Sequence, residues 1–264
     1  MTVSITVLLL IGVAVATDVT PSLPIRIGVL LPRNGTYPFT ERYIMPAASL
    51  ALDHVRYYGL LNTSYALSIS SRDTKCDEGN GMNEAIIYHI EGSLSAFFGP
   101  ICDYVAAPVA RQMAFWNRPM LSIGAMAREF KDRKQEVFTM LTRTGTTNLN
   151  TLAYAVKQAL MEEYHWSNLK LLYDRTAFGD INPDFCHLAT DSLVNSRLNL
   201  TAKIMVDYYR LTKATLSEAE LRRLLVDEVG NKYAGKSPIV RAVAGAVRET
   251  SAPFINSINY VTQE

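Results

Sequence analysis

Strand and helix signals alternate along the first half of this chain, and this alternation restricts the fold more than any other feature. Short apolar or β-branched runs at 25–31, 65–70, 94–100 and 118–124 indicate strands. Helical stretches separate them, at 43–57, at 82–90 and in a small-residue segment that reaches Arg111. This order predicts an α/β fold with a mostly parallel, doubly wound sheet and helices on both faces.

The pattern pauses over 125–147 and then starts again. A helical stripe at 149–160 precedes a strand at 169–173, a helix at 185–196 and a strand at 200–209. A capping-type sequence at Ser217 predicts a last helix that ends near Val229. We therefore expect a first lobe at 25–124, a crossover at 125–147, an incomplete second lobe at 148–229 and an unassigned tail at 230–264.

The first 17 residues are mostly apolar and end in the small-residue pattern Ala14-Val15-Ala16. This is typical of a secretory signal peptide that is cleaved after Ala16 or Thr17. An N-terminal membrane anchor is the alternative, although the run is shorter than the roughly 20 residues that a span requires. We expect a chain that is secreted or lies on the extracellular side of the plasma membrane, attached to it only through a C-terminal part that is missing here.

Three glycosylation sequons agree with that location, at Asn34, Asn62 and Asn199. The chain has 264 residues, 48% of them hydrophobic, which is enough to bury a substantial core. Its formal net charge of +1 gives no reason to expect nucleic acid as a partner.

The three cysteines are read most simply in an oxidising compartment, where a pair forms a disulfide. Cys76 and Cys102 follow consecutive strand signals, and parallel strands would bring them together. Such a bridge closes a loop of about 27 residues and contributes roughly 3 kcal/mol in the chain-entropy model. Cys186 then remains, either free or paired outside this chain.

Ligands of open parallel sheets bind beyond the carboxyl ends of the strands, where Cys76 and Cys102 are expected. If Asp103 is the N-cap of the helix that follows, the first backbone N–H groups of that helix favour an anion there. Pro108 implies that this helix begins nearer Ala107 or is kinked in its first turn.

Five segments resemble a known family in order and spacing: "IRIGVLLP", "PAASLALDHV", "GPICDYVAAPVARQMAFWNRPMLSIGA", "LTRTG" and "HWSNLKLLYDR". They are similar to the ligand-binding ectodomain of natriuretic peptide receptors and the related receptor guanylyl cyclases. The similarity covers residues 25–209 and is most specific over 99–124. It implies a type I periplasmic-binding-protein-like fold, a disulfide between Cys76 and Cys102, and a peptide hormone bound by a receptor homodimer.

The resemblance also implies individual site residues. A chloride would bind beside the disulfide, through the backbone amides of Ile101 and Cys102 and the hydroxyl of Ser71; no other cofactor is expected. Arg111 has an alternative interpretation as a helix-surface charge, and Tyr104 and Tyr173 as packing residues. The implied peptide contacts are Glu78, Tyr104, Arg111, Tyr173, Asp184 and His187.

The chain departs from the family at two points. His187 stands where an aromatic residue usually follows the second-lobe cysteine, which affects the expected hormone preference. The family pairs that cysteine with a later one, and no cysteine follows Cys186. The resemblance therefore implies a truncated ectodomain whose second lobe lacks strands.

One catalytic motif must be considered, because "GNKYAGKS" at 230–237 matches the phosphate-binding loop. A helix signal precedes it instead of a strand, Pro238 removes a backbone donor, and no aspartate follows Asp227. The four histidines show no zinc-binding spacing, and we expect no metal site. Three function classes remain: a peptide-hormone receptor ectodomain, an amino-acid-sensing ectodomain of the same fold and, least supported, an enzyme.

Overall fold

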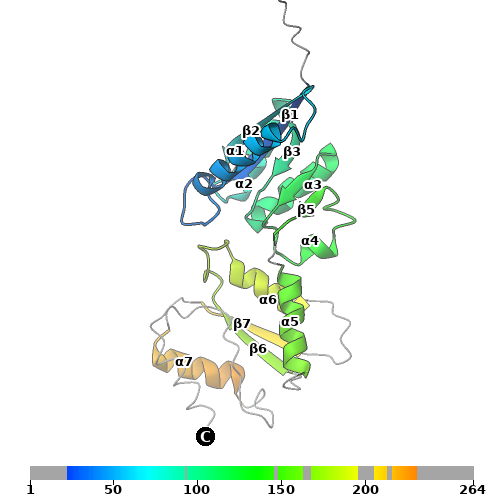
Figure 1. The fold of residues 1–264 in the computed structure, drawn as a ribbon. Coiled ribbons are helices and arrows are strands. Elements are labelled where there is room, and N and C mark those ends of the chain that lie inside the picture. Colours follow the sequence, from blue (N-terminus) through cyan, green and yellow to red (C-terminus); the bar gives the residue numbers. More distant parts are fainter. Residues whose placement is uncertain are drawn as a thin grey trace, which may run out of the picture.

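The computed structural model describes residues 23–92, 94–145, 148–162, 168–195, 205–212 and 216–230. They form two α/β lobes, one following the other along the chain (Figure 1). The first lobe contains β1 (Leu23–Leu31), α1 (Glu41–Tyr57), β2 (Tyr65–Asp73), α2 (Glu78–Ile90), β3 (Leu94–Phe98), α3 (Asp103–Trp116), β4 (Met120–Ser122), α4 (Glu129–Asp132) and β5 (Leu141–Arg143). The second contains α5 (Leu149–Glu162), β6 (Asn168–Tyr173), α6 (Phe185–Asn195), β7 (Met205–Arg210) and α7 (Glu218–Leu224), with a π-helical turn at Leu225–Val229.

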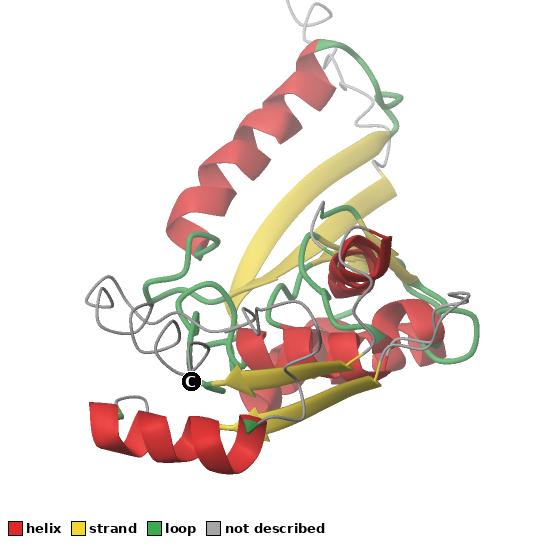
Figure 2. Ribbon diagram, turned by 90° about the horizontal axis from the view of Figure 1, so that it is seen from below, coloured by secondary structure: helices red, strands yellow, loops and turns green. Residues whose placement is uncertain are grey.

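The first sheet is parallel throughout, in the order β2-β1-β3-β4-β5. The chain moves outward from β1 to β2 and then back across β1, so right-handed connections place α1 on one face and α2 and α3 on the other. Figure 2 shows α1 standing apart from the other helices. The predicted doubly wound arrangement is confirmed. Its core includes Leu30 and Leu31 of β1, Phe97 of β3, and Val105 and Val109 of α3.

The segment 125–147 was expected to be an irregular crossover, and this was wrong. It contains α4 and β5, and β5 pairs with β4 to complete the first sheet. β5 has three residues, of which only Leu141 is buried. A strand this short cannot show the alternation of polar and apolar residues by which a sequence predicts a strand. The first lobe therefore extends beyond Gly124.

The beginning of α3 also differs from the prediction. The helix starts at Asp103, so Cys102 and not Asp103 is the N-cap, and Pro108 lies inside the helix rather than marking a later start. The carbonyl of Cys102 accepts from Val105 and Ala106 at 3.0 and 2.8 Å. The side chain of Asp103 is thereby free to bond outside its own helix.

The second lobe is built around β6, which is buried on both faces. Leu169 and Leu171 pack with α5 and α6, whereas Leu172 packs against the apolar side of α7 and its π-helical turn. Lys170 lies in the same strand, 5% exposed, with its ammonium 2.6 Å from Asp207 and 3.3 Å from Glu228. The apolar packing of Leu172 and the buried Lys170 cation therefore attach the last helix and its π-helical turn to the two-stranded parallel sheet β6-β7.

The predicted helix after Ser217 is confirmed, together with its cap. The Ser217 hydroxyl accepts from the backbone N–H of Glu220, and the Glu220 carboxylate accepts from the backbone N–H of Ser217. Among the described helices, none combines the length and apolar character that a membrane span needs.

Candidate functional site

The disulfide predicted between Cys76 and Cys102 is present, with the two Cα atoms 5.7 Å apart. It joins the segment after β2 to the start of α3. Gly124, which follows β4, lies against Ile101, the residue before Cys102. A side chain at position 124 would collide with the carbonyl oxygen of Ile101. Glycine is therefore required where the chain leaving β4 passes the residues before α3.

Asp103 connects the first lobe to the second. Its carboxylate is 3% exposed and accepts a hydrogen bond from the backbone N–H of Ala127 at 2.6 Å and another from the side-chain amide of Asn182. Asn182 lies in the loop between β6 and α6 and is itself 1% exposed. Burial raises the pKa of Asp103 to about 6, although these hydrogen bonds and the Arg143 guanidinium favour the ionised form.

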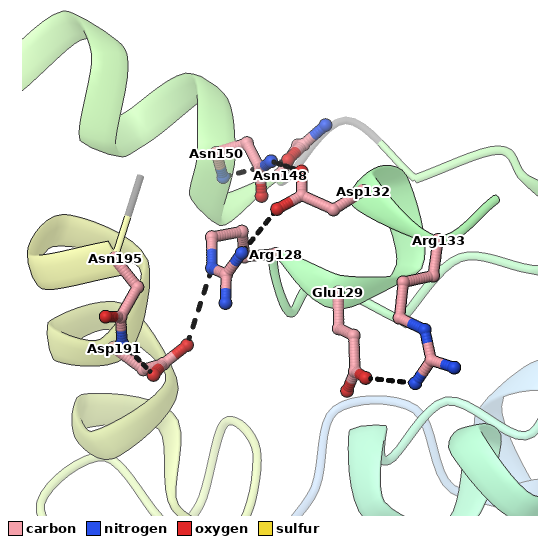
Figure 3. Close-up of polar contacts among 8 residues, drawn as sticks. All are labelled: Arg128, Glu129, Asp132, Arg133, Asn148, Asn150, Asp191 and Asn195. Carbon is pink, nitrogen blue, oxygen red and sulfur yellow. Dashed lines mark hydrogen bonds and ion pairs between the residues drawn. The ribbon is translucent and has the colours of Figure 1, made fainter. Parts of the chain in front are cut away.

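A second polar group crosses between the lobes beside Asp103. Arg128, just before α4, pairs with Asp132 and lies 3.7 Å from the Asp191 carboxylate on α6. Asn150, in the first turn of α5, donates to Asp132 at 3.3 Å. Figure 3 shows these side chains converging from α4, α5 and α6. The lobes therefore meet through charged and amide groups as well as through chain connections.

Ring and charged side chains gather at the carboxyl ends of β6 and β7. The Tyr173 hydroxyl lies 3.1 Å from Nδ1 of His187, with the two rings stacked. Arg175 forms a two-pronged ion pair with Asp184, with Nε and Nη2 at 2.6 and 2.8 Å from the carboxylate oxygens. This pairing lowers the pKa of Asp184. Tyr208 places its ring centroid 6.2 Å from that of Tyr173.

Tyr104 of the first lobe lies within electrostatic range of the same group. It follows Asp103 on α3 and is 38% exposed. Burial raises the pKa of its hydroxyl, and the nearby Asp184 carboxylate adds to this while Arg175 acts in the opposite direction. Four of the six predicted peptide contacts, Tyr104, Tyr173, Asp184 and His187, thus belong to one inter-lobe group, which we call the junction cluster together with Arg175.

The other two predicted contacts lie apart from the junction cluster. Arg111 is exposed, two helical turns along α3 from Tyr104, with its guanidinium 5.6 Å from the centre of the Phe138 ring. Glu78 is the exposed first residue of α2. Both belong to the first lobe alone.

The three residues expected to hold chloride differ in their surroundings. The N–H groups of Ile101 and Cys102 precede α3, and neither has an acceptor among the described residues. The Ser71 hydroxyl instead donates to the Glu41 carboxylate at 2.6 Å, and Arg33 pairs with the other oxygen of Glu41 at 2.8 Å. These contacts lower the pKa of Glu41, so a negative charge is already present beside Ser71.

Several sequence-predicted features fall outside the described residues or are partly covered by them. Asn34 and Asn62 are exposed, whereas Asn199 lies outside the described part. The phosphate-loop match is described only at Gly230, which follows a helix as the sequence indicated. Within the described ranges, no three histidine, cysteine or acidic side chains group as metal ligands would.

Arg175 and Asn182 are the site residues that the sequence prediction missed. Both lie in the turn-rich loop between β6 and α6, where no periodic pattern orients a side chain. The loop follows a buried parallel strand, and this location was the one sequence feature that could have indicated a binding site there.

Comparison with known proteins decides the family. A family model described as "Receptor family ligand binding region" (ANF receptor) matches residues 43–226. The chain belongs to this family. It is therefore a receptor ligand-binding region, and the matched residues include the described junction cluster and both cysteines of the disulfide.

Relatives of the receptor ligand-binding region include "Atrial natriuretic peptide receptor 3" of Rattus norvegicus, 34% identical over 161 residues, which covers 56% of this chain and 28% of that protein. "Receptor-type guanylate cyclase gcy-8" of Caenorhabditis elegans is 26% identical over 211 residues, covering 76% of this chain and 16% of that protein. The chain thus spans less than a third of the length of these relatives.

Solved structures agree on the fold. A substrate-binding protein of an ABC transporter from Desulfitobacterium hafniense has a TM-score of 0.56 at 15% identity, covering 76% of this chain and 54% of that one. The branched-chain amino acid binding protein LivJ of Streptococcus pneumoniae has a TM-score of 0.53 at 14% identity, covering 78% and 55%. The expected periplasmic-binding-protein-like type I fold is confirmed.

Proposed function

We propose that this receptor ligand-binding region acts on the extracellular side of a membrane and binds a peptide hormone of the natriuretic type. One observation carries the proposal: Tyr104 of the first lobe lies within electrostatic range of Asp184 and Arg175, which neighbour Tyr173 and His187 in the second. All of these except Arg175 are among the six contacts that the family resemblance implies. The region binds and does not catalyse in this proposal.

The chemistry of the junction cluster suits a peptide. Two phenols and an imidazole offer flat apolar surface with polar edges, the composition that protein interfaces favour. Asp184 is neutralised by Arg175, so a cationic ligand group must compete with that guanidinium. A ligand that touches both Tyr104 and the second lobe would alter how the lobes meet. In a parent homodimer, such a change is what a receptor transmits.

Calorimetry on the secreted glycoprotein tests this function. We expect a cyclic natriuretic-type peptide to bind and single amino acids not to bind. Tyr104→Ala and Asp184→Asn should each weaken peptide binding at least about tenfold, or about 1.4 kcal/mol. Arg133→Gln is the control, because Arg133 pairs with Glu129 on the first lobe and lies outside the junction cluster. Binding of an amino acid, with no response to the peptide, would instead favour the amino-acid-sensing receptor.

An anion beside the disulfide belongs to the same proposal. The N–H groups of Ile101 and Cys102 fit a chloride, since both donors stand at the positive end of α3. The Glu41 carboxylate opposes a contribution from Ser71. We expect chloride, compared with gluconate at equal ionic strength, to raise the melting temperature of the wild type and of Ser71→Ala equally. An effect that disappears in Ser71→Ala would return the serine to the site.

A further inference from the structure

Large apolar side chains are exposed around the end of α1 and the loop that follows it. Isolated exposed apolar residues are ordinary, but several large ones on neighbouring segments indicate a surface that something covers. We call this set the α1-end patch. It consists of Leu23 (59% exposed), Tyr57 (82%), Tyr58 (65%), Leu60 (68%), Leu61 (37%) and Tyr65 (44%).

Backbone contacts hold the α1-end patch together around Asn62. The N–H of Leu23 donates to the carbonyl of Ser64 at 2.7 Å, and Leu23 is the register partner of Tyr65. The N–H of Tyr65 donates to the carbonyl of Asn62 at 2.9 Å. On the other side, the N–H of Leu60 returns to the carbonyl of Val55 inside α1 at 3.1 Å. Asn62 therefore lies between the helical and the strand halves of the patch.

The amide oxygen of Asn62 is hydrogen-bonded, whereas its amide nitrogen has no acceptor among the described residues. Its Oδ1 accepts from the backbone N–H of Ser64 at 2.9 Å and from the Ser64 hydroxyl at 3.0 Å. Its Nδ2 has no acceptor among the described residues, and the residue is exposed. The sequon is thus arranged with its hydroxyl on the amide oxygen and its amide nitrogen toward solvent.

We propose that an N-linked glycan on Asn62 covers the α1-end patch. The proposal rests on the extracellular location within the proposed function. In the reaction, Asn62 Nδ2 loses a proton and bonds to the anomeric carbon of a lipid-pyrophosphate-linked oligosaccharide, whose bond to the pyrophosphate oxygen breaks. The lipid pyrophosphate leaves, and the sugar remains attached between the helical and strand segments of the patch.

The occupant is a glycan rather than a protein partner because of where the acceptor lies. A bulky sugar on Asn62 would obstruct a flat protein surface approaching the patch. The C–H faces of sugars also pack well on aromatic rings, and the patch contains the neighbouring rings of Tyr57 and Tyr58, with centroids 5.0 Å apart. α1 has no fully buried residue, so its last turns have little other packing to hold them.

The test uses the chain secreted from a eukaryotic host. Mass spectrometry of glycopeptides should find Asn62 modified. Asn62→Gln and Ser64→Ala should each raise the fluorescence of bound anilinonaphthalene sulfonate about twofold or more. Amide exchange over 52–60 should quicken about tenfold in both variants. Asn34→Gln is the matched control, because it removes a sequon before α1 and should change neither reading. Ser64→Thr keeps the sequon and should behave as the wild type.

Enzymatic removal of the glycan from the folded wild type keeps the inference testable if a variant folds poorly, and it should reproduce both changes. Unmodified Asn62 in a chain with glycosylated Asn34 and an intact Cys76–Cys102 bridge would overturn this inference alone. Unmodified Asn34 and Asn62 with reduced cysteines would overturn the extracellular location as well. Unchanged dye binding after deglycosylation would overturn the inference that the glycan covers the patch, because another segment or a second copy would then cover it.

Discussion

Asp103 is a single carboxylate that serves both lobes. It begins α3, receives the N–H of Ala127 from its own lobe, and receives the amide of Asn182 from the other. Because Cys102 occupies the N-cap position, Asp103 is released from the local capping role that its residue type suggests. Its burial makes ionisation costly, and its pKa is raised to about 6 for that reason.

The free energy of unfolding should depend on pH through the titration of Asp103. Its native pKa of about 6 lies above the ordinary 3.8, so the native chain holds an extra proton between these values. The free energy of unfolding should therefore fall as pH rises through this window, by up to about 3 kcal/mol. Urea unfolding at pH 4 and pH 7 should show this loss in the wild type and not in Asp103→Asn.

The exposed Asp53, substituted in the same way, is the control and should keep the wild-type pH dependence. Equal dependence in the wild type and Asp103→Asn would contradict this interpretation.

The elements of the first lobe depend on close backbone approach as much as on side-chain packing. β4 and β5 have only three residues each, and they contribute Met120 and Leu141 to the first-lobe core. The chain leaving β4 is placed by the contact of Gly124 with the Ile101 carbonyl, beside the disulfide. A side chain at that point would have to displace the segment that precedes α3.

Gly124→Ala should therefore destabilise the first lobe by about 2–4 kcal/mol, because backbone and not a flexible side chain must move. Gly79→Ala is the control. Gly79 lies in the first turn of α2, its added Cβ would have its nearest neighbour at 3.4 Å, and alanine is the better helix former. We expect that variant to be neutral or more stable by up to about 1 kcal/mol. Denaturant titration of both variants measures the difference; a Gly124→Ala variant as stable as Gly79→Ala would contradict it.

Long, periodic elements could be predicted from the sequence, and short or tertiary ones could not. The helices at 41–57, 149–162 and 185–195 lie within a few residues of their predicted bounds because their apolar faces repeat along the chain. β5 was missed because three residues show no period. The disulfide could be predicted because parallel strands bring together the segments that follow them.

The candidate site was predictable only in part, for a related physical reason. Tyr104, Tyr173, Asp184 and His187 came from a family resemblance, and the structure brings them together. Arg175 and Asn182 lie in an irregular loop, and their partners are 9 residues and 79 residues away in sequence. No local pattern encodes such contacts.

The two lobes together form a molecule whose halves meet through polar groups. Arg128 reaches Asp191, and Asn182 reaches Asp103, while apolar packing is described within each lobe separately. Interfaces of this kind are easier to rearrange than hydrophobic ones. A ligand at the junction cluster therefore needs only modest differential binding to change how the lobes meet.

Asn182→Asp should convert this contact into a pH-controlled one. Above about pH 6 a second carboxylate would face Asp103, and repulsion should separate the lobes, increasing the radius of gyration by about 1 Å. At pH 5, where the pair carries a proton, the variant should match the wild type. Small-angle X-ray scattering at both pH values measures this. Asn83→Asp, on the exposed surface of α2 in the first lobe, is the control. An unchanged radius of Asn182→Asp at pH 7.5 would contradict the prediction, because the two acids would then share a proton and hold the contact.

Cys186 is 4% exposed, and burial, with the nearby Asp174, raises the pKa of its thiol. With Cys76 and Cys102 joined, it is the remaining thiol of a chain with three cysteines. An alkylating reagent can therefore react in the native protein only when the second lobe opens. The rate at which Cys186 is labelled would therefore measure how fast the second lobe opens, independently of the first lobe and without an introduced probe.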